Sequence, residues 1–106
     1  MLQVNEKIQR TLALIFSQEF EIPIEFFLTV TRVDCAPDLK NAKVLLSVLP
    51  FNKSKDALLY LIHNRKEIQR LLGKRVNLKY TPILKFVIDE QTQKADEIYT
   101  TLDSLK

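Results

Sequence analysis

A basic run between residues 65 and 85 offers the clearest chemistry in this chain. Lysine and arginine side chains neutralise phosphate groups and release condensed counterions, so the run predicts noncovalent binding to a nucleic-acid backbone. A second interpretation is a solvated helix face whose cations offset the helix dipole. Six of the seven cations form the candidate phosphate-binding set. These six are Arg65, Lys66, Arg70, Lys74, Arg75 and Lys79, and the seventh is Lys85.

The two ends of the chain have the opposite charge balance. Residues 1–27 hold four acids and two bases, and residues 87–106 hold five acids and two bases. The net charge of +3 therefore understates how positive one surface is expected to be. A basic surface of this kind is typical of nucleic-acid binders. Lys40 and Lys43, beside a predicted turn, are further candidates for RNA contact.

Other residues capable of specific chemistry are few. Tyr80, in the basic run, is able either to stack on a base or to hold the start of a strand. His63, the only histidine, has no nearby nucleophile to serve as a general base, so we expect it at the surface or at a helix break. A single cysteine, Cys35, excludes an internal disulfide and is expected to pack as a small apolar side chain. We therefore expect no catalytic residue, no metal and no cofactor.

Hydrophobic periodicity predicts the elements that position these residues in the first half of the chain. Apolar residues at three- and four-residue steps predict an amphipathic helix over residues 4–20. Aromatic and β-branched residues predict a strand over residues 26–35, with a bulge or a strand end near Arg32 and Val33. Alternating residues 42–49 predict a second strand, close enough in sequence to pair antiparallel with the first.

An interrupted apolar stripe marks the next helical region. Asn52 or Ser54 is expected to cap its start, and Gly73 is expected to end it. Where the stripe should continue, the chain instead has Asn64 and Arg65. This gap indicates either a break between two shorter helices or a turn exposed at the surface.

The remaining elements complete a single domain. Residues 83–89 predict a third strand, and residues ~90–106 predict a C-terminal helical extension. The order of elements indicates an α+β fold over residues 1–106, with a three-stranded sheet covered by helices. No signal peptide and no apolar segment of about 18 residues is visible, so we expect a cytoplasmic protein without a membrane span.

Several segments carry the pattern of a known family. The order of elements resembles a type II KH domain, a fold that commonly binds single-stranded nucleic acid. At the residue level the chain resembles the ribosome-binding factor A family of bacterial small-subunit maturation factors, and the Pro-Asp-Leu and Thr-Pro motifs are distinctive. The matching segments are residues 4–10, 29–33, 37–44, 47–48, 71–75 and 78–90.

The resemblance implies a function without catalysis. Members of the family bind free small (30S) ribosomal subunits, not translating ribosomes, and assist late maturation and processing of 16S rRNA near its 5′-terminal helix. It implies a non-enzymatic factor without cofactor or small-molecule substrate, and we expect a monomer. Two alternatives stay open: a KH-like adaptor that acts through protein–protein contacts, and general single-stranded RNA binding.

The chain departs from the family pattern at one place. The family replaces the glycine-rich loop of other KH domains with a kink of alanine, any residue and glycine. In this chain the kink falls on Asn64, Arg65 and Lys66, which supply neither alanine nor glycine. Because asparagine tolerates left-handed backbone angles, the sequence predicts a retained kink with altered geometry. The two added cations provide possible phosphate contacts.

Overall fold

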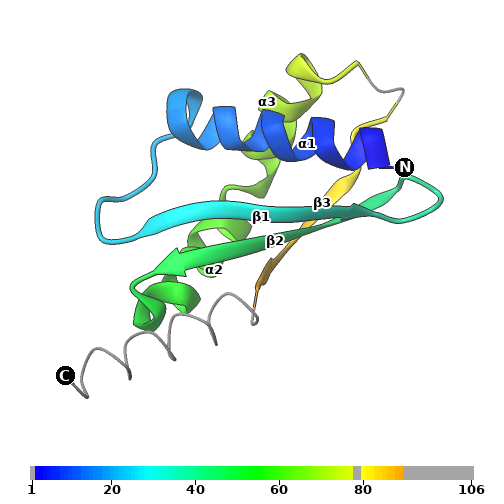
Figure 1. The fold of residues 1–106 in the computed structure, drawn as a ribbon. Helices are drawn as coiled ribbons and strands as arrows, with labels where there is room; N and C mark the ends of the chain where they lie inside the picture. Colours follow the sequence, from blue (N-terminus) through cyan, green and yellow to red (C-terminus); the bar gives the residue numbers. More distant parts are fainter. Residues whose placement is uncertain (1, 78–79, 90–106) are drawn as a thin grey trace.

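The computed structural model describes residues 2–77 and 80–89 (Figure 1). The elements in chain order are α1 (Leu2–Leu14) with a π-helical turn (Ile15–Glu19), β1 (Phe27–Cys35), β2 (Asn41–Leu49), a 3-10 turn (Phe51–Lys53), α2 (Ser54–His63), α3 (Arg65–Arg75) and β3 (Ile83–Ile88). Two of the predictions, the C-terminal helical extension over residues ~90–106 and the phosphate contact of Lys79, lie outside the described residues.

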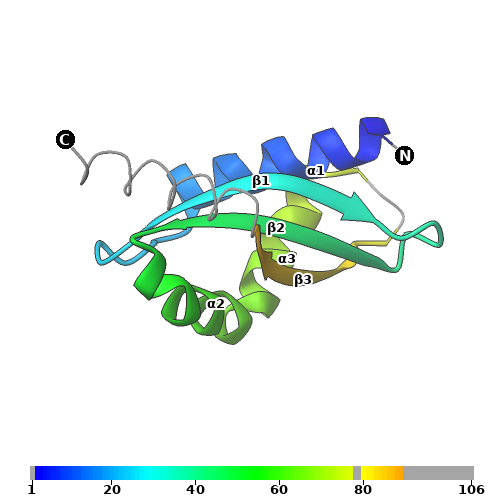
Figure 2. The same cartoon turned by 60° about the horizontal axis from the view of Figure 1, so that its bottom comes forward.

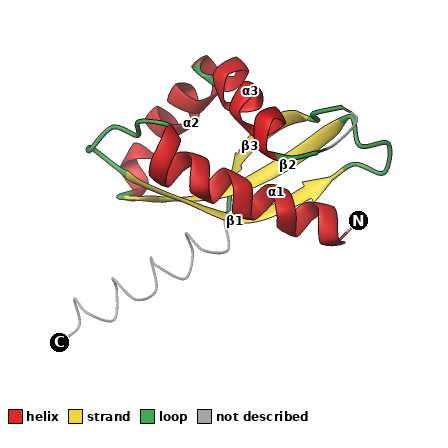
Figure 3. Ribbon diagram, turned by 90° about the horizontal axis from the view of Figure 1, so that it is seen from above, coloured by secondary structure: helices red, strands yellow, loops and turns green. Residues whose placement is uncertain are grey.

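The three strands form one mixed sheet in the order β1-β2-β3. β1 and β2 pair antiparallel, as predicted, whereas β3 pairs with β2 in parallel. The view from above shows all three helices over the same face of the sheet, with α1 along β1 (Figure 3). The α+β prediction is therefore confirmed, and the opposite face of the sheet is covered by none of the described helices.

The central strand β2 shows why this sheet forms. Its alternating residues Ala42, Val44, Leu46 and Val48 are fully buried beneath the helices, as the sequence predicts. Lys43 points to the opposite face and is exposed. Burial of apolar surface contributes about 25 cal/mol for each square ångström. This free energy fixes the orientation of β2, because a one-residue slip of the strand would expose all four side chains.

A bulge in β1 lies one residue before the predicted position. The pairing with β2 shifts between Val30 and Arg32, so Thr31 is the extra residue. The hydroxyl oxygen of Thr31 lies 3.2 Å from the carbonyl oxygen of Leu45 and 2.8 Å from a carboxylate oxygen of Asp89. The bulge therefore links β1 to the residue after β3, although β2 separates the two strands.

The ends of two helices differ from the sequence prediction. The α-helical part of α1 ends at Leu14, and a π-helical turn closed by the hydrogen bond from Phe20 N to Ile15 O (2.7 Å) carries the chain to Glu19. At the start of α2, the predicted cap at Asn52 or Ser54 is wrong. A 3-10 turn precedes the helix, and no side chain caps its first amides in this described segment.

Gly73 does not end the helix, which continues to Arg75. Its backbone has an ordinary negative φ, so the glycine is not needed for a left-handed turn. Instead, a Cβ atom built on Gly73 would lie 2.9 Å from the hydroxyl oxygen of Thr81. The absence of a side chain thus lets the last turns of α3 approach the segment that leads into β3.

This close approach predicts a coupled effect on stability. Alanine favours a helix interior over glycine by about 1 kcal/mol, but in Gly73→Ala the crowding against Thr81 should offset that gain. In the Thr81→Ala background the same substitution should stabilise the protein by about 0.5–1 kcal/mol. Urea unfolding of the four proteins measures the coupling. Equal stabilisation by Gly73→Ala in both backgrounds would show that the contact has no energetic role.

Candidate nucleic-acid interface

Helix α3 arranges three of the predicted cations along one side. Lys66, Arg70 and Lys74 recur every four residues and are exposed, so they form one row on the helix surface. We call this row the α3 ridge. Ile68 and Leu72, on the opposite side of the helix, are fully buried in the core and fix its orientation. Amphipathicity therefore places the cations at the surface.

Arg70 has a local counterion within the α3 ridge. Its Nε and Nη2 atoms donate hydrogen bonds of 2.9 and 2.5 Å to the two carboxylate oxygens of Glu67. This side-chain hydrogen bond, followed by the attraction of nearby cations, holds the pKa of Glu67 below its usual value. Within the described part of the chain, Lys66 and Lys74 form no ion pair, so they supply the uncompensated charge of the α3 ridge.

The other two α3 cations of the candidate set occupy different environments. Arg75 forms an ion pair with Glu19, which ties the end of α3 to the π-helical turn after α1. Arg65, the first residue of α3, is half-buried, and its Nε atom is buried without a hydrogen-bond partner among the described residues. Their phosphate contacts stay a prediction, but Arg75 has a structural partner that the sequence did not reveal.

The break between α2 and α3 is confirmed, but it is confined to Asn64. This residue has φ −102° and ψ 15°, which is not a left-handed conformation, while Arg65 and Lys66 already belong to α3. The backbone and side-chain nitrogens of Asn64 both donate to the carbonyl oxygen of Tyr60, at 3.1 and 2.8 Å. An asparagine side chain therefore stabilises the break without the alanine and glycine of the family pattern.

Tyr60 also holds α2 in place beneath the loop before β1. Its hydroxyl donates a 2.5 Å hydrogen bond to the carbonyl oxygen of Glu21. Its ring packs edge-on against Phe20 and Phe26, with centroids 5.8 and 6.4 Å away. Edge-to-face packing of this kind is a favourable geometry for aromatic rings. The break at Asn64 therefore follows a helix whose end is held in place by the contacts of Tyr60.

Lys40 and Lys43 lie apart from the α3 ridge. Lys40 is exposed in the loop between β1 and β2, where its backbone N–H donates to the Asp38 carboxylate at 2.9 Å. Lys43 projects from the uncovered face of the sheet, so the sheet separates it from α3. The structure therefore places Lys43, one of the further candidates, on the opposite face of the sheet from the α3 ridge.

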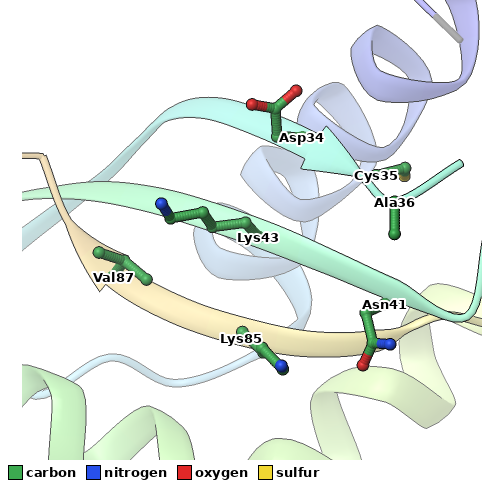
Figure 4. A pocket seen from close by; sticks show the side chains of 7 residues that line it. All are labelled: Asp34, Cys35, Ala36, Asn41, Lys43, Lys85 and Val87. Carbon is green, nitrogen blue, oxygen red and sulfur yellow. The ribbon is translucent and has the colours of Figure 1, made fainter.

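Lys43 has a cationic neighbour, Lys85, that does not belong to the candidate set. The parallel pairing of β2 with β3 places Lys85 directly beside Lys43 (Figure 4). The two side chains help to line a shallow hollow whose other lining residues are Asp34, Cys35, Ala36, Asn41 and Val87. The two lysines are neighbours because β2 and β3 pair in this parallel register. The residue pattern of neither strand predicts that register.

The remaining single residues behave as their sequence context indicates. Cys35 is half-buried at the end of β1, and burial, followed by repulsion from Asp34, raises the pKa of its thiol. His63 is exposed at the last position of α2, directly before the break. Over the described ranges there is no cluster of three metal-ligating side chains, and no helix is long and apolar enough to cross a membrane.

The order of elements, the mixed sheet and the break between α2 and α3 define a KH-like α+β domain of type II. A family model described as Ribosome-binding factor A matches residues 1–102. The chain therefore belongs to the ribosome-binding factor A family, as the sequence resemblance predicted.

Individual relatives agree with the family assignment, and a solved structure agrees with the fold. A ribosome-binding factor A from Agathobacter rectalis is 36% identical, with 98% of this chain and 88% of the relative covered, and one from Bdellovibrio bacteriovorus is 33% identical, with 98% and 78% covered. The crystal structure of the Thermus thermophilus factor has a TM-score of 0.72 at 22% identity, covering 82% of this chain and 92% of the other.

A second similar structure comes from a ribosomal complex. It is a Thermus thermophilus ribosome-binding factor A model fitted into a cryo-EM map of a complex with the 30S subunit. It is 27% identical to this chain, with a TM-score of 0.67, and covers 78% of this chain and 88% of the other.

Proposed function

We propose that this protein binds the free small ribosomal subunit, contacts 16S rRNA, and assists the late maturation and processing of that RNA near its 5′-terminal helix. The observation that carries the proposal is the α3 ridge, which presents Lys66 and Lys74 on the surface of a rigid helix. Membership in the family and the 30S complex of the Thermus thermophilus relative support the choice of partner.

The mechanism that follows is recognition of shape and charge. The buried side of α3 fixes the positions of the lysine stems. The cations of the α3 ridge therefore meet RNA phosphates at the fixed four-residue spacing of the helix. Each phosphate neutralised releases counterions, and this makes binding weaker as the salt concentration rises. The protein then holds a local RNA conformation without making or breaking a covalent bond.

Co-sedimentation with purified ribosomal particles tests this function. We expect the protein to pellet with free 30S subunits, not with assembled ribosomes, and to be released as salt rises from about 50 to 200 mM. Retention on neither particle would refute the proposal. Accumulation of unprocessed 16S rRNA in cells that lack the protein, restored by the intact chain, tests the maturation step separately.

One observation favours the alternative of a protein adaptor. Ile24 is 98% exposed and Phe27 is 77% exposed, and both lie at the end of the sheet where the edge strand β1 begins. Exposed apolar side chains at a sheet edge are typical of protein-binding surfaces. An adaptor would bind the subunit with little dependence on salt, and it would lose binding when Phe27 is changed rather than when Lys66 and Lys74 are changed.

A further inference from the structure

At the end of the domain opposite Phe27, three segments distant in sequence meet. They are the loop between β1 and β2, the last turns of α3, and residues 80–82 before β3 (Figures 1 and 2). The backbone N–H of Ile83 donates a 2.9 Å hydrogen bond to the carbonyl oxygen of Lys40, which joins the first segment to the third. The contact between Gly73 and Thr81 joins the second to the third.

Tyr80 stands at this junction with most of its side chain in solvent. It is 73% exposed, whereas Pro82, two residues later, is fully buried and Leu84 is 0% exposed. The backbone N–H of Leu84 in turn donates a hydrogen bond to Oε1 of Gln69 in α3, with 3.1 Å between nitrogen and oxygen. The entry into β3 is therefore held by Pro82, Leu84 and Gln69, while the side chain of Tyr80 stays exposed.

The two other segments of the junction each carry an exposed cation. Lys40 is exposed on the loop bonded to Ile83, and Lys74 is exposed next to Gly73, which contacts the residue after Tyr80. Ile83, three residues after Tyr80, is half-exposed and adds apolar surface to the same segment. An aromatic face between phosphate-binding side chains is the arrangement that single-stranded nucleic-acid binders use, because a base stacks on the ring while its phosphates meet the cations.

We infer that Tyr80 is a base-stacking residue for an unpaired RNA nucleotide, with Lys40 and Lys74 on the flanking phosphates. The inference rests on the proposed function and extends it, because it assigns the recognition of a single-stranded segment to this junction. Lys74 belongs both to the α3 ridge and to the junction, so one RNA strand would pass from the helix onto the tyrosine ring. Duplex RNA, whose bases are already stacked on each other, offers no face to Tyr80.

The test compares the full-length chain with three variants: Tyr80→Ala, Tyr80→Phe and Phe27→Ala. Binding is measured by fluorescence anisotropy with an unpaired RNA oligonucleotide of mixed sequence and with a duplex of the same sequence. Tyr80→Ala should weaken binding to the unpaired RNA by roughly 5- to 150-fold and leave the slope against salt unchanged. Tyr80→Phe keeps the ring and should bind like the unchanged protein, as should Phe27→Ala, which removes the exposed aromatic at the far end.

The outcomes separate this inference from the proposed function. If the unchanged protein binds RNA with the expected salt dependence but Tyr80→Ala binds equally well, the stacking role is refuted and the proposed function stands. If Tyr80→Phe weakens binding as much as Tyr80→Ala, the hydroxyl acts and stacking is refuted. If the unchanged protein binds neither RNA nor 30S subunits, both fail. Circular dichroism of each variant shows whether the fold is kept.

Discussion

Reversing the two unpaired charges of the α3 ridge, Lys66→Glu with Lys74→Glu, is expected to reduce affinity for the 30S subunit by roughly a hundredfold at low salt. Each lysine that neutralises one phosphate contributes roughly a factor of ten there, and its loss should also lower the slope of log affinity against log salt by about 0.7–0.9. Affinities of the double variant, measured at several salt concentrations, therefore report both the size and the electrostatic origin of the effect.

A matched control changes the same net charge elsewhere. Lys7 on α1 and Lys55 in the first turn of α2 are both exposed, so Lys7→Glu with Lys55→Glu alters the overall charge equally without touching α3. We expect it to lose far less affinity. Arg75→Glu is not a suitable substitute, because it would place two carboxylates together at Glu19 and disturb the joint between α1 and α3. Equal losses in both double variants would mean that net charge, not the α3 ridge, governs binding.

Truncation of a core residue in the central strand is expected to have the largest effect on stability. Leu46 is fully buried in the cluster shared by the sheet and all three helices. Leu46→Ala should lower the free energy of unfolding by about 2–5 kcal/mol, through lost burial and the cavity left behind. Against a total of about 5–15 kcal/mol for a typical domain, this is a large fraction. Urea unfolding, with the slope compared between variants, measures the change.

The neighbouring residue provides the control for that substitution. Leu45 has the same side chain one position earlier in β2, but it points to the uncovered face of the sheet and is only half-buried. Leu45→Ala should therefore cost much less than Leu46→Ala. Similar losses for the two variants would contradict the one-sided core described for this sheet.

The sequence predicted the elements that depend on local pattern. Alternation in β2 identified its buried face, because period-two burial is visible in any single strand. The gap at Asn64 located the helix break, because a polar residue interrupts an otherwise continuous stripe. Gly73 was misread for the same reason: its local context resembles a helix end, and only the folded chain shows that Thr81 lies against it.

The parts of the candidate site that the sequence did not predict depend on contacts between distant segments. The ion pair of Arg75 with Glu19 joins residues 56 positions apart, so no spacing rule indicates it. The pairing of Lys43 with Lys85 requires the parallel register of β3. The α3 ridge was predictable as a charged segment, and the pairing of Arg70 with Glu67, three residues earlier on the same helix, is a local contact that helix spacing indicates.

The parallel pairing of β3 with β2 has a consequence for how the chain folds during synthesis. The hairpin of β1 and β2 is complete once residue 49 has left the ribosome, but the second edge of β2 has no strand partner until residues 83–88 emerge. Parallel pairing across so long a crossover closes slowly, because the loop entropy is lost before the contacts form. For that interval one edge of the nascent hairpin stays open to other chains. Because α1 precedes the hairpin in the chain and α2 and α3 precede β3, helices are available to cover its apolar face before β2 gains its second strand partner.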